Sequence, residues 1–145
     1  MQPKPTQVPT PYGPPISLEL AKRVMTAAEA EAVANRWPMV IVIVDSGGHL
    51  VMLHKLDQAA LGSVSIAQSK AETAVNFKCP TKVFEEALAA GGLGLRLLSM
   101  RNLIALEGGI PLILDGKMIG AIGVSGMLPA QDGQVAAAGA NALEG

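Results

Sequence analysis

Apolar residues recur every three or four positions in four segments of the chain, which predicts four helices. These span approximately residues 18 to 35, 63 to 78, 82 to 90 and 129 to 143. Ser17 is placed to cap the first helix, and Asn35 and Pro38 stop it. Thr81 is placed to cap the third helix, and Pro129 opens the last one.

Two segments between these helices carry the apolar runs of β-strands. The first is MVIVIVDSGGHLVMLHKLD, in which residues 39 to 45 are apolar on both faces and a Gly-Gly turn follows. The second is IPLILDGKMIGAIGVSG, in which Asp115-Gly116 supplies a two-residue turn. Tight turns of this kind join antiparallel strands, and a strand that is apolar on both faces belongs in the centre of a sheet. Residues 91 to 105 carry no clear period.

The order of these elements predicts an α/β (α+β) fold. We expect a three-layer α/β/α sandwich with one antiparallel sheet of about five strands between helices. Residues 1 to 15 hold six of the ten prolines and predict an N-terminal arm that is mobile or clasps a partner. Residues 16 to 145 have the length of a single domain.

Composition and charge narrow the classes of function. The formal net charge is -1, and the basic residues do not form the stripe that binding to nucleic acid requires. No apolar run has the length of a membrane span and the N-terminus does not have the pattern of a signal peptide, so the expected location is the cytosol. Half of the residues are apolar and only 16% are charged, which favours a homo-oligomer whose subunits cover apolar surface.

One lysine breaks the pattern of the second predicted helix. Lys70 falls within its apolar arc, between Phe77 and Ala74. A buried ammonium group needs an anion, must lose its proton, or must reach back to water. Two interpretations remain open: a structurally paired or snorkelling lysine, and a lysine that contacts a ligand anion or takes part in catalysis. Its candidate protein partners are Asp45, Glu107 and Asp132, which all lie next to glycine-rich turns.

Glycine-rich segments suggest a site near this lysine. The strand segment DGKMIGAIGVSG has four glycines, which are needed either for tight packing or for the approach of a ligand. Ser125 and Gly126 precede a helix start, whose free N–H groups favour an anion. Glu107 stands before Gly108 and Gly109, where it is a candidate general base.

The candidate metal ligands are two histidines and one cysteine. Strand alternation places His54 on one face with Leu50, Met52 and Leu56, and His49 on the other face, so the two histidines do not form one zinc site. Cys79-Pro80 is a dipeptide found where a thiolate binds heme iron, although a buried, inert thiol is the alternative. With one cysteine the chain has no internal disulfide.

The sequence blocks also resemble a known family. VIVDSGGHLVMLHKLDQAALGSVSIAQSKAETA, FKCPTKVFEEAL and GGIPLILDGKMIGAIGVSGMLPAQDGQVAAAGANAL together are similar to the GlcG/HbpS family, which includes the C-terminal domain of PduO-type corrinoid adenosyltransferases. The resemblance implies a profilin-like sandwich, assembly into homo-oligomers and, in several members, binding of heme. The family's motif positions fall on Asp45, Gly47, Gly48, Lys70, Thr73, Pro80, Gly108 to Pro111, Gly120, Gly123, Ser125, Gly126 and Asp132.

Three functional hypotheses follow, the last of which is a structural or regulatory subunit whose pocket is vestigial. In the first, the protein is a cytosolic binding protein for heme or a related tetrapyrrole, with Lys70 at an acidic substituent and His54, His49 or Cys79 at the iron. Asp45, Gly108, Gly109, Ser125 and Gly126 are further candidate ligand-binding residues. In the second, it is a cofactor-free enzyme for a small carboxylate or carbonyl metabolite, with Lys70 binding the substrate and Asp132 or Glu107 moving a proton.

Overall fold

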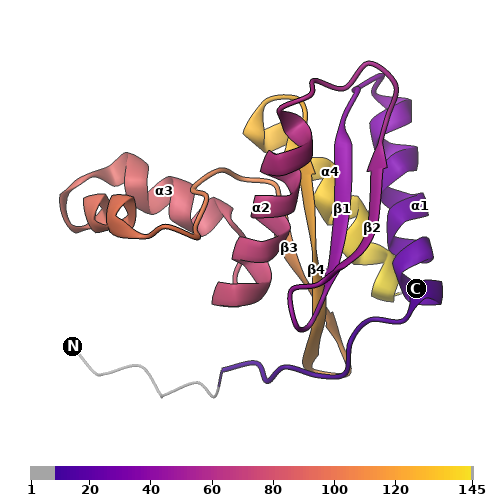
Figure 1. Cartoon of the computed structure of the whole chain (residues 1–145), viewed down its shortest axis with the longest axis horizontal. Coiled ribbons are helices and arrows are strands. Elements are labelled where there is room, and N and C mark those ends of the chain that lie inside the picture. Colours follow the sequence, from indigo (N-terminus) through magenta and orange to yellow (C-terminus); the bar gives the residue numbers. More distant parts are fainter. Residues whose placement is uncertain (1–8, 145) are drawn as a thin grey trace.

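An antiparallel sheet of four strands lies between helices on both of its faces (Figure 1). The computed structural model describes residues 9–144. The strands are β1 (Val40–Asp45), β2 (Leu50–Lys55), β3 (Gly109–Leu114) and β4 (Lys117–Ser125), in the order β2-β1-β4-β3. Helices α1 (Leu18–Ala34) and α4 (Pro129–Asn141) cover one face, and α2 (Ser63–Phe77) covers the other. The predicted three-layer sandwich is confirmed, with four strands in the described part of the chain where about five were expected.

The central strand β1 separates two apolar cores. Ile41 and Ile43 pack on the side of α1 and α4, whereas Val40, Val42 and Val44 pack on the side of α2. Alternate side chains of a strand point to opposite faces, so a strand covered on both sides must be apolar throughout. The continuous Val/Ile run therefore has the position that its composition predicts.

Both hairpins form at the predicted turns. Asp115 and Gly116 have φ angles of 53° and 76°, as a two-residue turn between β3 and β4 requires. The register of β2 against β1 shifts between Ile43 and Val44, so that Met52 lies opposite Ile43 and Leu50 lies opposite Val44. Opposite residues share a face, and the bulge therefore turns Leu50 toward the α2 side. The predicted common face of Leu50 and His54 is thus wrong.

The described part of the proline-rich segment lies along the sheet. Tyr12 forms a parallel bridge with Met118, and the Met118 N–H donates to the Pro11 carbonyl at 2.9 Å. The Tyr12 hydroxyl donates to the Val75 carbonyl at the end of α2 at 2.7 Å. This segment occupies the edge of β4 beyond the last pair of β1. Residues 1–8 of the predicted arm lie outside the described residues.

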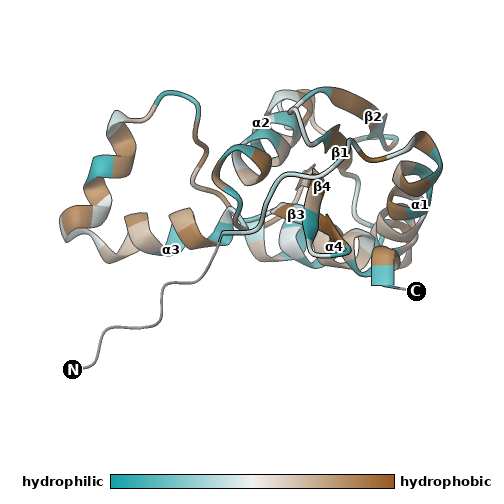
Figure 2. Cartoon of the chain, turned by 90° about the horizontal axis from the view of Figure 1, so that it is seen from below, coloured by the Kyte–Doolittle hydropathy of each residue, from teal (hydrophilic) through white to brown (hydrophobic). Residues whose placement is uncertain are grey.

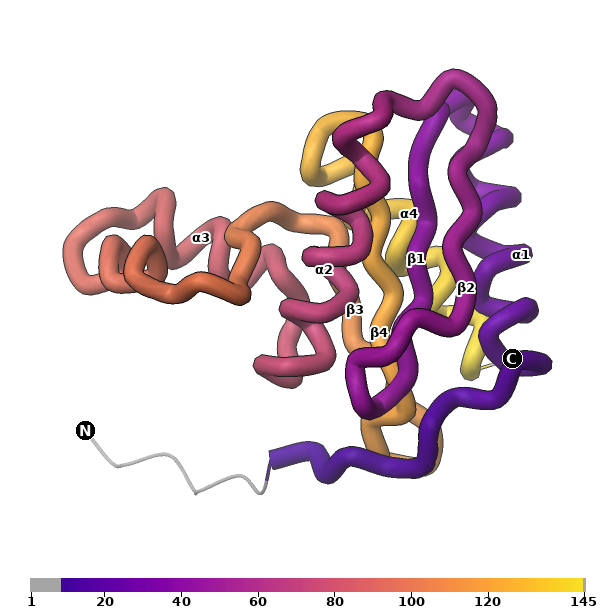
Figure 3. The backbone as a smooth tube through the Cα atoms, in the orientation of Figure 1, coloured from indigo at the N-terminus to yellow at the C-terminus, as the bar shows by residue number. Residues whose placement is uncertain are grey.

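Residues 82–106 leave the sandwich as one excursion between α2 and β3 (Figure 3). It contains α3 (Lys82–Ala90) and a 3₁₀ helix, η1 (Gly92–Ser99). The two helices pack on each other, and neither has a fully buried residue. Apolar segments recur along this projecting part in Figure 2. We call residues 82–106 the α3–η1 excursion.

Candidate functional site

The predicted buried lysine is paired with an aspartate of the same chain. The Lys70 ammonium lies 2.9 Å from Asp132 Oδ2 and donates to the Val124 carbonyl at 3.0 Å. Lys70 is 1% exposed and Asp132 is 2% exposed. An ion pair this deep is stable only when hydrogen bonds satisfy both partners, and this one has them. Of the two interpretations of Lys70, the structure supports the paired lysine.

Glycines bring the surrounding backbone onto this pair. A Cβ added to Gly108, whose φ is +135°, would lie 2.8 Å from the Lys70 ammonium and 2.5 Å from the Val124 carbonyl. At Gly123 it would lie 2.1 Å from the Ala67 carbonyl of α2. These distances are shorter than real Cβ contacts, so only glycine allows the strand and the loop to approach α2. In this structure these glycines serve close packing.

Asp132 also occupies the start of α4. Its Oδ1 accepts a hydrogen bond from the Met127 N–H at 3.0 Å. A carboxylate in this position satisfies the positive end of the helix dipole, so the predicted anion site is already filled by the protein. Burial raises the pKa of Asp132, against hydrogen bonds from Lys70 and Met127 that lower it. Ser125 and Gly126 lead into this turn, and Gly126 packs on the Pro38 carbonyl.

The other two candidate partners of Lys70 lie elsewhere. Asp45 Oδ1 accepts hydrogen bonds from the N–H groups of Gly47 and His49, at 2.9 and 3.0 Å, and so holds the β1–β2 turn. Asp45 pairs with Gly120, which is ~13 Å along β4 from Val124. The Glu107 side chain lies against Gly133 of α4, where an added Cβ would be 2.2 Å from its Oε2.

Thr81 does not cap α3 with its side chain, contrary to the prediction. Its hydroxyl oxygen accepts from the Gly109 N–H at 2.8 Å, and its own N–H donates to the Gly109 carbonyl at 3.0 Å. Thr81 is fully buried, and this double link ties the start of the α3–η1 excursion to the start of β3. The hydroxyl bonds a strand residue far away in sequence, which local capping rules do not foresee.

The three candidate iron ligands lie apart, and the described residues include no group of three or more His, Cys, Asp or Glu that could hold a metal ion. His54 Nδ1 is hydrogen-bonded to Glu29 of α1. His49 is 83% exposed, with its Nδ1 3.5 Å from Asp45. Cys79 is half-buried, and burial raises the pKa of its thiol. A raised pKa lowers the fraction of Cys79 that is present as thiolate, which is the form that binds iron.

An apolar cleft that the sequence did not reveal lies beside His54. Its volume is about 490 Å³, and its lining includes Val33 of α1, Arg36, Trp37 and Leu56. Leu56 stands two residues after His54, and Val33 stands one helical turn after Glu29, so the same two segments carry the cleft and the His54–Glu29 pair, although neither residue of the pair lines the cleft. The cleft forms where the end of α1 meets the segment after β2, which are distant in sequence. It is an open groove whose volume is within the range of small-molecule sites.

Comparisons with known proteins agree with this architecture. A family model described as "Haem degrading protein HbpS-like" matches residues 16–141. The chain is 40% identical to Protein GlcG of Escherichia coli K12 over 110 residues, which is 76% of this chain and 81% of GlcG. A Streptomyces reticuli HbpS double mutant has a TM-score of 0.82 and 28% identity, over 99% of this chain and 97% of HbpS. The PduOC:heme complex has a TM-score of 0.79 and 29% identity, over 88% and 94% of the two chains.

None of the helices formed by residues 9–144 is both long and apolar enough to cross a membrane.

Proposed function

The chain belongs to the HbpS-like family, and from this premise we propose that it binds heme or a related tetrapyrrole in the cleft beside His54. The observation that carries the proposal is the hydrogen bond between His54 Nδ1 and Glu29. A carboxylate that holds one ring nitrogen fixes the orientation of the imidazole and raises its basicity as a ligand. The other nitrogen, Nε2, is then the coordinating atom.

The lining of the cleft matches the rest of a tetrapyrrole. Val33, Trp37 and Leu56 present apolar and aromatic surface to the macrocycle, and Arg36 presents a cation to its carboxylates. The cleft volume of about 490 Å³ is within the range of small-molecule sites. These residues suit the group that the family name implies, although Asp57 also places a carboxylate in the lining. The structure of a relative, PduOC, is described as a heme complex, which supports the same class of ligand.

Each residue has a separate role in this proposal. His54 would ligate the iron, Glu29 would orient His54, and Arg36 would pair with a carboxylate of the tetrapyrrole, while the apolar lining would exclude water. Bound heme iron supplies redox and oxygen chemistry, which the polypeptide lacks. Lys70 plays no part at this cleft, because its ammonium is already paired with Asp132.

A hemin titration of the purified apoprotein tests this function. We expect a saturable shift of the Soret band with one hemin per chain, and we expect His54→Ala to remove the shift. His49→Ala is the matched control, because the exposed His49 lies in the β1–β2 turn and its Nδ1 is 3.5 Å from Asp45 without a side-chain hydrogen bond, and this variant should bind hemin as wild type does. An unshifted or non-saturable band, or equal loss in both variants, would contradict the proposal.

The enzyme hypothesis has less support. Lys70 and Asp132 are at most 2% exposed, so a substrate does not reach them in this conformation. The partly buried Glu107 side chain lies against Gly133 of α4 and forms no salt bridge with Lys70. Catalysis by these three residues stays a prediction.

We also propose that the protein is a homo-oligomer whose subunits meet through the α3–η1 excursion. Leu93 and Leu98 are 79% and 72% exposed. Between α3 and η1 an apolar cleft of about 510 Å³ is lined by Val83, Phe84 and Leu97, among others. Exposed apolar surface of this kind is typical of a surface that another subunit covers. In a two-fold symmetric dimer the same surface of each copy meets the other, so the α3–η1 excursion of one subunit would pack on that of the second.

A further inference from the structure

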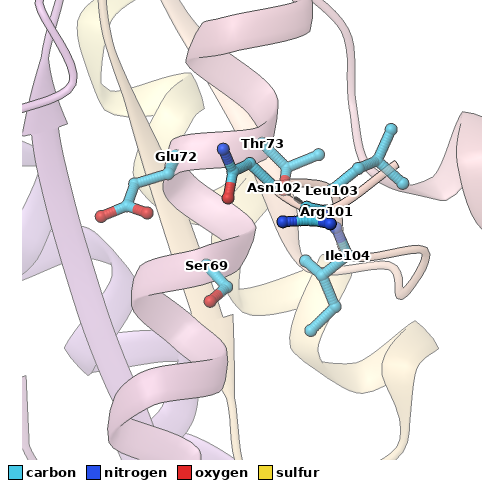
Figure 4. Close-up of a pocket in the computed structure, with 7 residues that line it drawn as sticks. All are labelled: Ser69, Glu72, Thr73, Arg101, Asn102, Leu103 and Ile104. Atoms are coloured by element: carbon cyan, nitrogen blue, oxygen red, sulfur yellow. Dashed lines mark hydrogen bonds between the residues drawn. The ribbon is translucent and has the colours of Figure 1, made fainter. Parts of the chain in front are cut away.

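A second cavity lies on the other side of the sheet, between α2 and residues 101–104 (Figure 4). Its volume is about 300 Å³, and more of its surface is polar than apolar. Ser69, Glu72 and Thr73 form the α2 side, and Arg101 and Asn102 form the opposite side. The cavity shares no residue with the cleft beside His54, so it belongs to a different site.

The chain holds this cavity in place through one buried contact. Thr73 is 1% exposed, and its hydroxyl oxygen accepts a hydrogen bond from the Ile104 N–H at 3.1 Å. This contact fixes residues 101–104 relative to α2. Thr73 lies one turn after Ser69 and next to Glu72, so the floor of the cavity is a regular helix. A site built on a fixed helix keeps its polar groups at constant separations.

Two opposite charges line the cavity without neutralising each other. Glu72 Oε1 accepts a hydrogen bond from Gln68 at 3.4 Å, and Arg101 has no salt bridge or hydrogen bond within residues 9–144. In Figure 4 the Glu72 side chain points to the left of α2 and the Arg101 side chain lies to the right, with Asn102 between them and Ser69 lower on the helix. Ser69 and Asn102 add a hydroxyl and a carboxamide that can donate or accept hydrogen bonds.

From this arrangement we propose that the cavity binds a free amino acid as its zwitterion. The Arg101 guanidinium pairs with the α-carboxylate, which it can hold through two parallel hydrogen bonds. The Glu72 carboxylate accepts from the α-ammonium group, and Ser69 and Asn102 complete the hydrogen bonds between the two charges. A ligand with a single charge would leave one of the two protein charges without a partner. The volume of about 300 Å³ fits a small molecule of this class.

The test uses the full-length protein and the standard L-amino acids, each titrated singly by calorimetry and by ¹⁵N–¹H NMR. We expect at least one to bind saturably and to shift the amide signals of Ser69, Thr73 and Asn102. Its analogues without the amino group or without the carboxyl group should each bind about tenfold more weakly, because each loses one charged contact. If no amino acid shifts these signals, or if either analogue binds as tightly as the amino acid itself, the proposal is wrong.

Two substitutions assign the contacts. Arg101→Met should weaken the amino acid about tenfold and leave the analogue without a carboxyl group unaffected. Glu72→Gln should also weaken binding of the amino acid about tenfold, but it should leave binding of the analogue without an amino group unaffected. Arg96→Met is the control, because Arg96 lies in η1 and lines a different cleft, and it should bind as wild type does. Equal binding by Arg101→Met and Arg96→Met would overturn the assignment. The hemin titration does not depend on this cavity, so the two proposals fail separately.

Discussion

Lys70 and Asp132 form a hydrogen-bonded ion pair that joins α2 to the start of α4 across β4. The two residues are 62 positions apart in the chain, and both are almost completely buried. The Lys70 ammonium lies directly beside Gly108, and the Asp132 carboxylate satisfies the positive end of α4. The role of the pair is therefore to hold the two helical layers on the sheet.

Lys70→Met should destabilise the fold by about 3 kcal/mol, because it leaves the Asp132 carboxylate buried without its cation. Urea unfolding followed by circular dichroism measures the loss. The double variant Lys70→Met/Asp132→Leu should recover most of it, since replacing both charges by apolar groups of similar volume is often neutral. A single variant as stable as wild type would show that the pair contributes nothing.

The pH dependence of stability should carry the signature of Asp132. Burial raises the pKa of this carboxyl above 3.8, so the folded protein keeps a proton there that the unfolded chain has released. Stability therefore falls as the pH rises from 3.8 through the folded pKa. The difference in unfolding free energy between wild type and Asp132→Asn should decline over that window and level off above it. A difference that rises with pH would mean that the pKa is lowered instead.

Gly108→Ala should cost about 2 kcal/mol of stability, because the new Cβ meets the Val124 carbonyl and the Lys70 ammonium at a positive φ. Gly62→Ala is the matched control: Gly62 has a φ of -63° and open space around its Cα. Its unfolding free energy should stay within about 0.5 kcal/mol of wild type. Thermal unfolding of both variants makes the comparison, and equal melting temperatures would remove the packing argument.

Glu29→Gln should weaken hemin binding about 10-fold without abolishing it, because the variant loses the charge that orients His54 but keeps the cleft. Glu19→Gln, in the first turn of the same helix, should have no effect. Hemin titrations of the three proteins, monitored at the Soret band, give the dissociation constants. If Glu29→Gln binds as tightly as wild type, Glu29 does not position the iron ligand.

Leu98→Glu should weaken self-association by about 2 kcal/mol, because it places a charge in the proposed interface of the α3–η1 excursion. Leu61→Glu changes a leucine that is 85% exposed but lies in the loop before α2, and it should leave the association unchanged. Sedimentation velocity over a range of concentrations distinguishes the outcomes. A wild-type chain that sediments as a monomer at every concentration would contradict the oligomer.

The local pattern of apolar, capping and turn residues predicted most of the helices and strands. The boundaries of α1, α2 and α3 agree with the expected ranges to within about one residue. Caps, prolines and turn glycines act within a few residues, so the sequence displays them directly. The place of Lys70 in the apolar arc of α2 also predicts its burial, which the structure confirms.

Several features could not be predicted from the sequence, because they depend on contacts between residues that are far apart in the chain. The β-bulge between Ile43 and Val44 places Leu50 on the other face of the sheet. The Thr81 hydroxyl accepts a hydrogen bond from Gly109 and does not cap its own helix. The cleft beside His54 needed the end of α1 and the segment after β2 to meet. The contact of Glu29 with His54 could not be predicted either, because in the sequence Glu29 is only one of several polar residues of the first helix.

The sequence by itself determined the elements, their order and the burial of one lysine, because periodicity and turn chemistry are local properties of the chain. Only the tertiary structure decided that Asp132, and neither Asp45 nor Glu107, is the anion beside that lysine. The reason is physical. All three carboxylates carry the same charge, and only the packing of distant strands and helices determines which one lies within hydrogen-bonding distance of the lysine.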